Sequence, residues 1–254
     1  MDNKKVVLIT GAGRGLGKVI AQKLVEEGFI VYGTYNTSND VMVSGVNFLK
    51  LDITSEEECA KVIKTIVEKE KRLDVLINSA GITLSGLTLQ FNPHDFQRIL
   101  DINVVGAFRL IKAAVIAKPK LIINITSLNG FLSLPNFGIY ASSKFALEAL
   151  GTALHYELGP DTQVVSVAPG ALKNEESAKK MEHKPVREKF PLLNLIIPLT
   201  SMSDVAKVVI KLINSRLVPI RVIVGRDAKI IHLLQKLLPN SLMDRILMLM
   251  WKKK

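Results

Sequence analysis

Hydrophobic and polar positions follow two alternating patterns along the chain. Short apolar runs rich in β-branched residues are separated by longer segments with helical periodicity, and the runs occupy residues 5–9, 30–35, 46–51, 73–78, 120–126, 163–168 and 220–224. Strands that are apolar on both faces are typical of a parallel sheet covered by helices. The pattern therefore predicts an α/β fold, a doubly wound parallel sheet of about seven strands flanked by helices on both faces.

A buried helix face is predicted after the third apolar run. Ser55 and Glu58 have the spacing of a capping box that would start this helix. Apolar residues then follow with i, i+3, i+4, i+7 and i+8 spacing, namely Cys59, Val62, Ile63, Ile66 and Val67. Because Cys59 belongs to this series, it is interpreted as a core thiol rather than a reactive one. The same spacing recurs at Val205, Val208, Val209 and Leu212.

The composition agrees with one domain over residues 1–254. Of these residues, 48% are hydrophobic and 22% are charged, and no internal repeat is present. The single cysteine excludes an internal disulfide and fits a reducing compartment. No apolar run approaches the roughly 20 residues that span a bilayer, and the first run is too short for a secretion signal. We therefore expect a soluble, cytoplasmic protein.

The formal net charge of +11 would suit nucleic acid, an anionic membrane or an acidic partner. Lysine and arginine are scattered, with local density only at residues 180–189 and 252–254. No zinc spacing, basic zipper or aromatic RNA-binding motif accompanies them, so a solvated basic surface is favoured over nucleic-acid binding. The four histidines have no ligand spacing, and no catalytic metal is expected.

A glycine-rich turn follows the first apolar run directly. Its sequence, TGAGRGLG, places Gly11, Gly15 and Gly17 between a predicted strand and an amphipathic helix. Glycines let the backbone approach a pyrophosphate, and the helix N-terminus supplies N–H donors and a partial positive charge. Glycines also occur in ordinary tight turns, but this strand–turn–helix context favours nucleotide binding.

The end of the second run indicates which nucleotide is bound. An NAD site would place a carboxylate there, whereas this chain has Thr34, Tyr35 and Asn36. Arg14, within the glycine turn, can reach a 2′-phosphate, with Asn36, Thr37 and Ser38 as further donors. The alternative for Arg14 is a solvated loop residue. Together the two features predict NADP(H) rather than NAD(H).

Asp52, after the third run, either accepts from the adenine amino group or begins a turn.

Carbonyl chemistry is suggested by four polar residues. Tyr140 and Lys144 are one helical turn apart, so a lysine ammonium, together with the positive nicotinamide of the oxidised cofactor, can lower the pKa of the phenol. Ser127, at the end of the fifth run, can hydrogen-bond a substrate oxygen beside Tyr140. Asn103 is expected to begin a helix and to hold a water that relays protons through Lys144. Taken singly, each residue has an ordinary explanation, because tyrosine and lysine at this spacing often lie on a plain helix face.

In combination, these motifs resemble the classical short-chain dehydrogenases/reductases. The order and approximate spacing of TGAGRGLG, NSAG (78–81), NVVG (103–106), ITS (125–127), YASSK (140–144) and PG (169–170) match that family over about residues 4–225. The resemblance implies a Rossmann-type fold, an NADP cofactor and a catalytic tetrad of Asn103, Ser127, Tyr140 and Lys144. It also implies cofactor contacts by Leu16, Asp52, Ile53, Asn78, Ala80, Gly81, Tyr140, Lys144, Pro169 and Gly170.

Two positions depart from the family pattern within the cofactor motifs. Ser79 replaces an asparagine of the usual NNAG, and Asn174 stands where a threonine commonly contacts the nicotinamide amide. Asparagine can still donate and accept hydrogen bonds, so Asn174 is retained as a candidate cofactor contact.

The C-terminal third suggests a lipophilic substrate. By the resemblance, residues 171–199 form a substrate lid, and their apolar content suits a hydrophobic ketone or aldehyde, or else ordinary packing or a dimer contact. The residues after the last run resemble the ending of reductases that act on steroids, retinoids and other lipophilic carbonyls. The alternatives are a 3-oxoacyl-[acyl-carrier-protein] reductase, with an acidic partner, and a non-catalytic NADP(H) sensor. Residues 227–254 form a helical tail, of which 242–254 either contacts a membrane surface or packs on the body or another subunit. The family usually forms homodimers or homotetramers.

Overall fold

A seven-stranded parallel sheet forms the centre of the computed structural model, which describes residues 4–36, 42–172 and 199–251. Its strands are β1 (Val6–Ile9), β2 (Ile30–Tyr35), β3 (Val46–Lys50), β4 (Val75–Asn78), β5 (Leu121–Ile125), β6 (Gln163–Pro169) and β7 (Arg221–Val224). They pair in the order β3-β2-β1-β4-β5-β6-β7. The predicted doubly wound sheet is confirmed, and its strand order reverses between β1 and β4, where such folds bind ligands.

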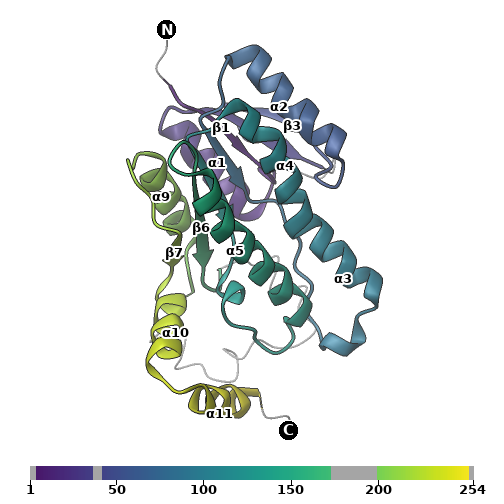
Figure 1. Cartoon of the computed structure of the whole chain (residues 1–254), viewed down its shortest axis with the longest axis vertical. Coiled ribbons are helices and arrows are strands. Elements are labelled where there is room, and N and C mark those ends of the chain that lie inside the picture. The colour runs from purple at the N-terminus through teal and green to yellow at the C-terminus, as the bar shows by residue number, and fades with distance from the viewer. Residues whose placement is uncertain (1–3, 37–41, 173–198, 252–254) are drawn as a thin grey trace.

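Helices cover both faces of the sheet (Figure 1). They are α1 (Gly15–Glu26), α2 (Glu56–Glu70), α3 (Pro93–Leu100), α4 (Gly106–Ala114), α5 (Gly138–Leu158), α9 (Met202–Ile213), α10 (Arg226–Leu237) and α11 (Asn240–Trp251). Short helical turns are η1 (Thr88–Gln90), the π-helical η2 (Asp101–Val105), η3 (Val115–Ala117) and η4 (Leu128–Gly130). Among the described residues, no helix combines the length and apolar character needed to cross a membrane.

Alternate residues of each central strand face two separate cores. Val7 and Ile9 of β1 pack under α1 and α9, whereas Val6 and Leu8 pack under α2, α4 and α5. All four side chains are buried, as the nearly continuous apolar pattern predicts. The edge strand β3 departs from that pattern, because Asn47 and Lys50 are exposed.

Helix α2 carries the buried face that its spacing predicts. Cys59, Val62, Ile63 and Ile66 are buried, and burial raises the pKa of Cys59 to about 11, as expected for an inert core thiol. The predicted capping box forms only in part. Ser55 Oγ accepts from the backbone N–H of Glu58, but the Glu58 carboxylate accepts from the N–H of Asp52 instead of returning to Ser55.

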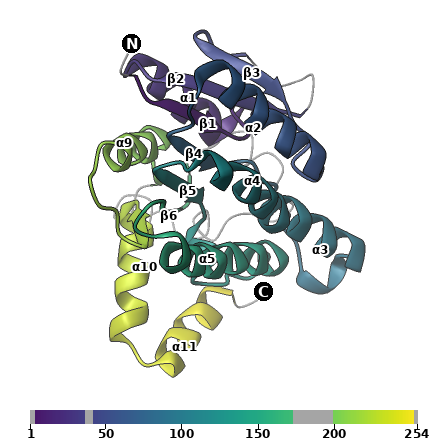
Figure 2. The ribbon, with the colours of Figure 1, turned by 45° about the horizontal axis from the view of Figure 1, so that its top comes forward.

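Helices α10 and α11 lie beyond the last strand, at the end of the molecule away from α2 (Figure 2). Ala228 and Met243 are buried in a small cluster with Leu128 and Leu132, which lie in and just after η4. Gln235 Nε2 also donates to the carbonyl oxygen of Phe131 at 2.9 Å. The inner side of the tail is therefore packed on the body.

Candidate active site

The glycine turn lies at the carboxyl end of β1, beside the point where the strand order reverses. Gly11 and Gly15 have positive φ angles of 67° and 53°, which side chains rarely adopt. A methyl group at Gly17 would collide with the carbonyl oxygen of Gly11, whereas one at Gly15 would meet no atom within 4 Å. The turn is thus tightly closed on one side and open in front of the α1 N-terminus, a geometry that suits a phosphate group.

Two threonine side chains fix this turn to its neighbours. Thr10 Oγ1 accepts from the backbone N–H groups of Ser79 and Ala80, both at 2.9 Å. Thr34 Oγ1 accepts from the N–H of Gly11 at 3.3 Å. Sequence reasoning missed Thr10, although it is the first letter of the TGAGRGLG motif. Because its bonds go to backbone N–H groups, Ser79 can replace the family asparagine without disturbing them.

Replacing Thr10 by valine is expected to destabilise the fold by about 2 kcal/mol, because two backbone N–H groups lose their shared acceptor. Equilibrium urea unfolding measures this change. Thr10→Ser is the matched control, since it keeps the hydroxyl and should unfold close to wild type. Equal midpoints for the valine and serine variants would show that the two hydrogen bonds contribute nothing.

The end of β2 lies beside the glycine turn. Ala12 N–H donates to the carbonyl oxygen of Thr34 at 2.9 Å, which brings the two segments together. Arg14 is exposed immediately before α1, Tyr35 is half-buried and Asn36 is exposed. Thr37 and Ser38, the remaining candidate donors at this position, lie outside the described residues.

Asp52 lies in a turn, which is one of the two interpretations that the sequence allowed for this residue. Its Oδ1 accepts from the backbone N–H and the hydroxyl of Thr54, at 2.9 and 2.7 Å. These hydrogen bonds lower the pKa of Asp52 below its usual value. The neighbouring Ile53 is buried, and a methyl group at Gly106 would press against it. The adenine contact of Asp52 stays a prediction.

Tyr140 and Lys144 face each other across one turn of α5. The Lys144 ammonium lies 5.8 Å from the centre of the Tyr140 ring and donates to the carbonyl oxygen of Ile125 at 3.0 Å. Lys144 is buried, and desolvation lowers its pKa to about 8, although the negative charge of Glu148 opposes this. The lysine is thus held in a dry position at the carboxyl end of β5.

The phenol of Tyr140 is strongly desolvated. Burial raises its pKa, and hydrogen-bonding interactions with Ser127 and Thr83 lower it only in part. The lowering expected from Lys144 together with an oxidised nicotinamide stays a prediction. The interaction with Ser127 does place the two predicted residues together. Thr83 was missed by sequence reasoning, since nothing in its local pattern separates it from a loop residue.

Asn103 does not begin a helix, contrary to the prediction. It lies within η2, a π-helical turn that joins α3 to α4, and its side chain is buried. Its Oδ1 accepts from the N–H of Ile82 at 2.8 Å and its Nδ2 donates to the Ile82 carbonyl at 2.9 Å. The extra residue of a π turn redirects a side chain inward, and such turns are frequent at functional sites.

Asn103 brings the loop after β4 close to Lys144. A methyl group at Gly81 would lie 3.0 Å from Asn103 Oδ1 and 3.9 Å from Lys144 Nζ. Ser143, between Tyr140 and Lys144, takes part in the same network. Its hydroxyl accepts from Asn103 Nδ2 at 3.0 Å and donates to the Tyr140 carbonyl at 2.7 Å. Ser143 thus connects Asn103 to the helix that carries Tyr140. The neighbouring Ser142 is exposed.

A buried carboxylate lies one turn beyond Lys144. Glu148 accepts from the hydroxyl of Thr126, and Arg221 Nε donates to its Oε2 at 2.7 Å. Asn78 and Asn124, paired across β4 and β5, are hydrogen-bonded to each other at 2.9 Å. The sheet below the candidate site is therefore lined with polar side chains rather than with the apolar residues of the two cores.

The Pro169–Gly170 segment closes the site at the end of β6. Asp227, which is buried, accepts from the N–H of Ala171 at 2.7 Å and from the Thr200 hydroxyl at 2.9 Å. A methyl group at Gly170 would collide with this carboxylate. Asp227 was not predicted. Most of the proposed lid, 173–198, and Asn174 within it lie outside the described residues.

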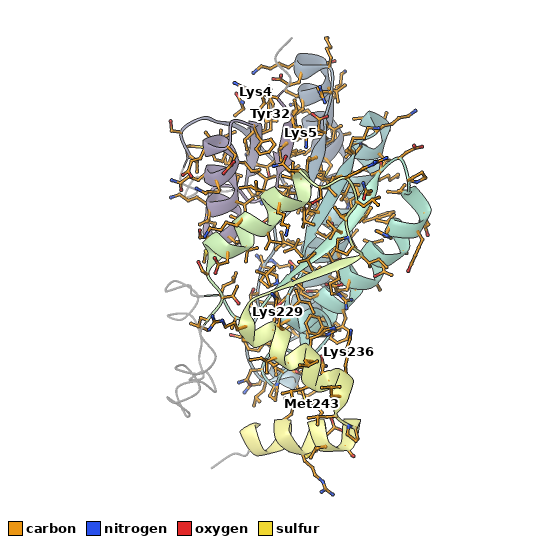
Figure 3. The ribbon with its side chains drawn as sticks, turned by 90° about the vertical axis from the view of Figure 1, so that its left-hand side faces the viewer. Lys4, Lys5, Tyr32, Lys229, Lys236 and Met243 are labelled. Atoms are coloured by element: carbon orange, nitrogen blue, oxygen red, sulfur yellow. The ribbon has the colours of Figure 1, made fainter. Side chains whose placement is uncertain are left out.

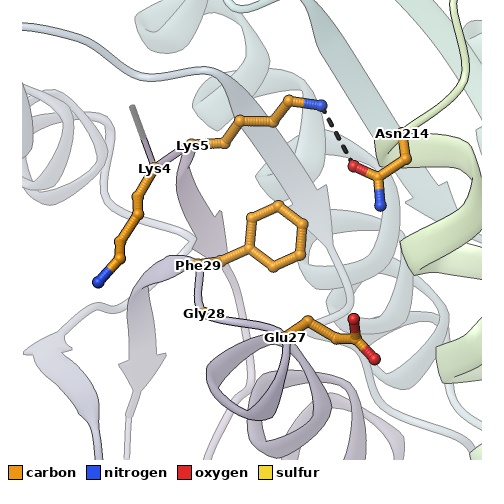
Figure 4. A pocket seen from close by; sticks show the side chains of 6 residues that line it. All are labelled: Lys4, Lys5, Glu27, Gly28, Phe29 and Asn214. Atoms are coloured by element: carbon orange, nitrogen blue, oxygen red, sulfur yellow. Dashed lines mark hydrogen bonds between the residues drawn. The ribbon is translucent and has the colours of Figure 1, made fainter. Parts of the chain in front are cut away.

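Two surface hollows lie apart from this arrangement. One, of about 260 Å³, is at the opposite edge of the sheet, where Lys5 Nζ donates to Asn214 Oδ1 at 3.4 Å and to the Ile213 carbonyl at 2.6 Å (Figure 4). The other, of about 450 Å³, lies between η1, α3 and the first turn of α5. Within the described part of the chain, no group of three or more His, Cys, Asp or Glu side chains could hold a metal ion.

Known proteins resemble this chain in sequence and in fold. The sequence profile of the short chain dehydrogenase family matches residues 5–185. A 3-ketodihydrosphingosine reductase of Bacteroides thetaiotaomicron is 34% identical over 171 residues, which cover 65% of this chain and 63% of that protein. A 3-oxoacyl-[acyl-carrier-protein] reductase of Synechocystis is 31% identical over 74% of this chain and 82% of its own length.

A solved structure that contains a cofactor is also similar. The protein ElxO with NADP bound superposes with a TM-score of 0.75 and 29% sequence identity, over 87% of this chain and 96% of ElxO.

Proposed function

This chain belongs to the short-chain dehydrogenase family, and we propose that it is an NADPH-dependent reductase of a lipophilic ketone or aldehyde. One observation carries the proposal. Tyr140 and Lys144 of α5, Ser127 after β5 and Asn103 of η2 come from three separate segments and meet at the carboxyl edge of the sheet, beside the glycine turn. An arrangement of this kind can position a carbonyl group and protonate its oxygen.

The residues of the glycine turn fit a dinucleotide. Gly11, Gly15, Leu16 and Gly17 leave backbone space at the α1 N-terminus, where aligned N–H groups favour a pyrophosphate. Further contacts are proposed from Asp52, Ile53, Asn78, Ala80, Gly81, Pro169 and Gly170, which lie along the same edge of the sheet. When bound, the nicotinamide supplies the hydride that this chemistry requires.

Tyr140 acts as the proton donor in this proposal. A phenol with a raised pKa is protonated at neutral pH, which suits it to donate a proton to a carbonyl oxygen. Ser127 hydrogen-bonds the same oxygen, while Lys144 places a positive charge near the phenolate that forms. Asn103 holds the Ile82 backbone beside Lys144, and through Gly81 fixes the distance between that loop and the ammonium.

NADPH is preferred over NADH in this proposal. The support is the exposed Arg14 at the start of α1, the absence of a carboxylate at the described end of β2, and the NADP-bound similar structure. A charge-assisted hydrogen bond contributes roughly 1.5–3 kcal/mol.

Arg14→Ala is accordingly expected to weaken NADPH binding by about 10- to 100-fold and NADH binding much less. Fluorescence titration of both cofactors measures this difference. Lys61→Ala, which removes a cation from the exposed side of α2, is the control for loss of net charge. Equal weakening of both cofactors would count against a 2′-phosphate contact.

Two similar proteins point to two substrate classes. The similarity to a protein named 3-ketodihydrosphingosine reductase favours a long-chain ketone. A 3-oxoacyl-[acyl-carrier-protein] reductase is the second candidate, supported by the other relative and by a net charge of +11 that suits an acidic carrier.

A panel assay tests these alternatives. NADPH oxidation is followed with long-chain ketones, steroids, retinal, quinones and acyl thioesters at equal concentration. Turnover of the free lipophilic carbonyls supports the first proposal, and turnover restricted to carrier-bound thioesters supports the second. NADPH binding with no turnover across the panel would favour a non-catalytic sensor.

We also propose a homodimer or homotetramer in the cytoplasm. Phe108 on α4 and Phe145 on α5 are exposed on neighbouring helices, which would be covered by a second copy. Molar mass by light scattering tests this, and a strict monomer at micromolar concentration would exclude it.

A further inference from the structure

The outer side of the C-terminal helices carries an apolar stripe. Ile230, Leu233 and Leu237 of α10 have i, i+3 and i+7 spacing, and Leu233 and Leu237 are 55% and 69% exposed. On α11, Leu242 and Met248 are also exposed. The opposite side of the same helices, with Ala228 and Met243, is buried against the body. The stripe therefore lies on the side of the tail that does not pack on the body.

Basic side chains accompany this stripe. Lys229 and Lys236 lie along α10 (Figure 3). In the sequence, Arg226 precedes the stripe and Arg245 lies between Leu242 and Met248 of α11. The acidic residues of α10 and α11 are Asp227, which is buried, and Asp244. The sequence adds three lysines at 252–254. Exposed leucines bordered by cations are typical of helices that lie in the plane of an anionic membrane.

We propose that the outer side of α10 and α11 docks on an anionic lipid bilayer. This surface, defined by Ile230, Leu233, Leu237, Leu242 and Met248 with their basic neighbours, is called the tail surface below. Apolar side chains would enter the acyl boundary, and each lysine or arginine near the surface would gain electrostatic attraction.

Charge decides between a bilayer and a second copy of the chain. A symmetric dimer formed through the tail surface would bring the same basic surface of two copies together, and the like charges of Lys229 and Lys236 in the two copies would oppose it. Anionic headgroups have the complementary charge. Helix α10 also begins at the carboxyl end of β7, so the docked surface would lie on the side of the molecule that holds the candidate active site.

Vesicle co-sedimentation of the full chain tests this docking. We expect binding to vesicles of phosphatidylcholine with phosphatidylserine, and much weaker binding to phosphatidylcholine alone. Lys229→Glu with Lys236→Glu should weaken binding by about 10-fold or more. The double substitution Leu233→Gln and Leu237→Gln should weaken vesicle binding at both low and high salt, because the insertion of apolar side chains into the bilayer does not depend on charge.

The control is a matched charge reversal at the other end of the molecule. Lys61→Glu with Lys64→Glu changes two exposed lysines of α2 and should leave vesicle binding unchanged. Circular dichroism checks that each variant folds. Three outcomes would each overturn the proposal. The α2 and α10 variants could lose binding equally, or the wild type could fail to bind vesicles. The wild type could also form a dimer that dissociates in the Leu233/Leu237 variant. Vesicle binding does not depend on substrate turnover, so failure of the proposed function would leave this result intact.

Discussion

Tyr140→Phe is expected to lower kcat for carbonyl reduction by about three orders of magnitude, the effect of removing a well-placed general acid. Phenylalanine keeps the ring that faces Lys144 and the packing of α5, and it removes only the hydroxyl that interacts with Ser127 and Thr83. NADPH affinity should therefore stay within about twofold of wild type, since the hydroxyl is assigned to proton transfer. Single-turnover rates and cofactor titration separate these two quantities.

Tyr156→Phe is the matched control for this substitution. Tyr156 lies on the same helix and is 70% exposed, so removing its hydroxyl should change neither turnover nor stability. If Tyr140→Phe kept most of the activity of wild type, the proton would have to come from another group, and the proposed role of the Tyr140 phenol would be lost. If it abolished NADPH binding as well, the residue would act mainly in holding the cofactor.

The sheet could be predicted from the sequence because its strands have a simple local signature. The residues from Val6 to Ile9 are buried whichever face of β1 they point to. Because both faces are covered, the strand is a nearly continuous apolar run in the sequence. The helix faces were predictable for the same reason, as the buried Cys59, Val62 and Ile66 show. At the sheet edge the rule weakens, because β3 pairs with a neighbour on one edge only and its residues Asn47 and Lys50 are exposed.

The site was predictable where its residues share an element or a motif. Tyr140 and Lys144 are one turn apart on a single helix, so their proximity follows from helix geometry. Thr10, Thr83 and Ser143 were missed because their partners are far away in the sequence. Thr10 meets residues 79 and 80, and Ser143 meets Asn103, through contacts that only the folded sheet creates.

The pKa of Tyr140 illustrates a second limit of sequence reasoning. A spacing of four residues indicates that a lysine is close, but it does not reveal how far both groups are desolvated. In the structure, desolvation acts on both and in opposite directions, raising the pKa of Tyr140 and lowering that of Lys144. The magnitude of burial decides the outcome, and burial is a property of the whole fold.

Lys144→Met is expected to lower kcat by about 10²- to 10³-fold while making the protein more stable at neutral pH. The buried ammonium has a pKa of about 8 in place of 10.5, so its charged form costs stability below pH 8. That cost is roughly 2–3 kcal/mol. Methionine has a similar length and carries no charge, but it loses the hydrogen bond to Ile125, about 1 kcal/mol. The net gain is about 1–2 kcal/mol, or several degrees in Tm.

The pH dependence gives this prediction a second, independent readout. Between pH 8 and 10.5 the unfolded chain holds a proton on Lys144 that the folded chain has released, so this residue makes wild-type stability rise with pH across that window. Lys144→Met should remove this contribution, so the advantage of the variant should shrink as the pH approaches 10.5 and give way to a deficit of about 1 kcal/mol from the lost hydrogen bond to Ile125. Lys112→Met, at an exposed lysine of α4, should keep the wild-type profile. A Lys144→Met protein that is less stable than wild type at pH 7, with the same rise at alkaline pH, would mean that Lys144 is not held as a desolvated ammonium.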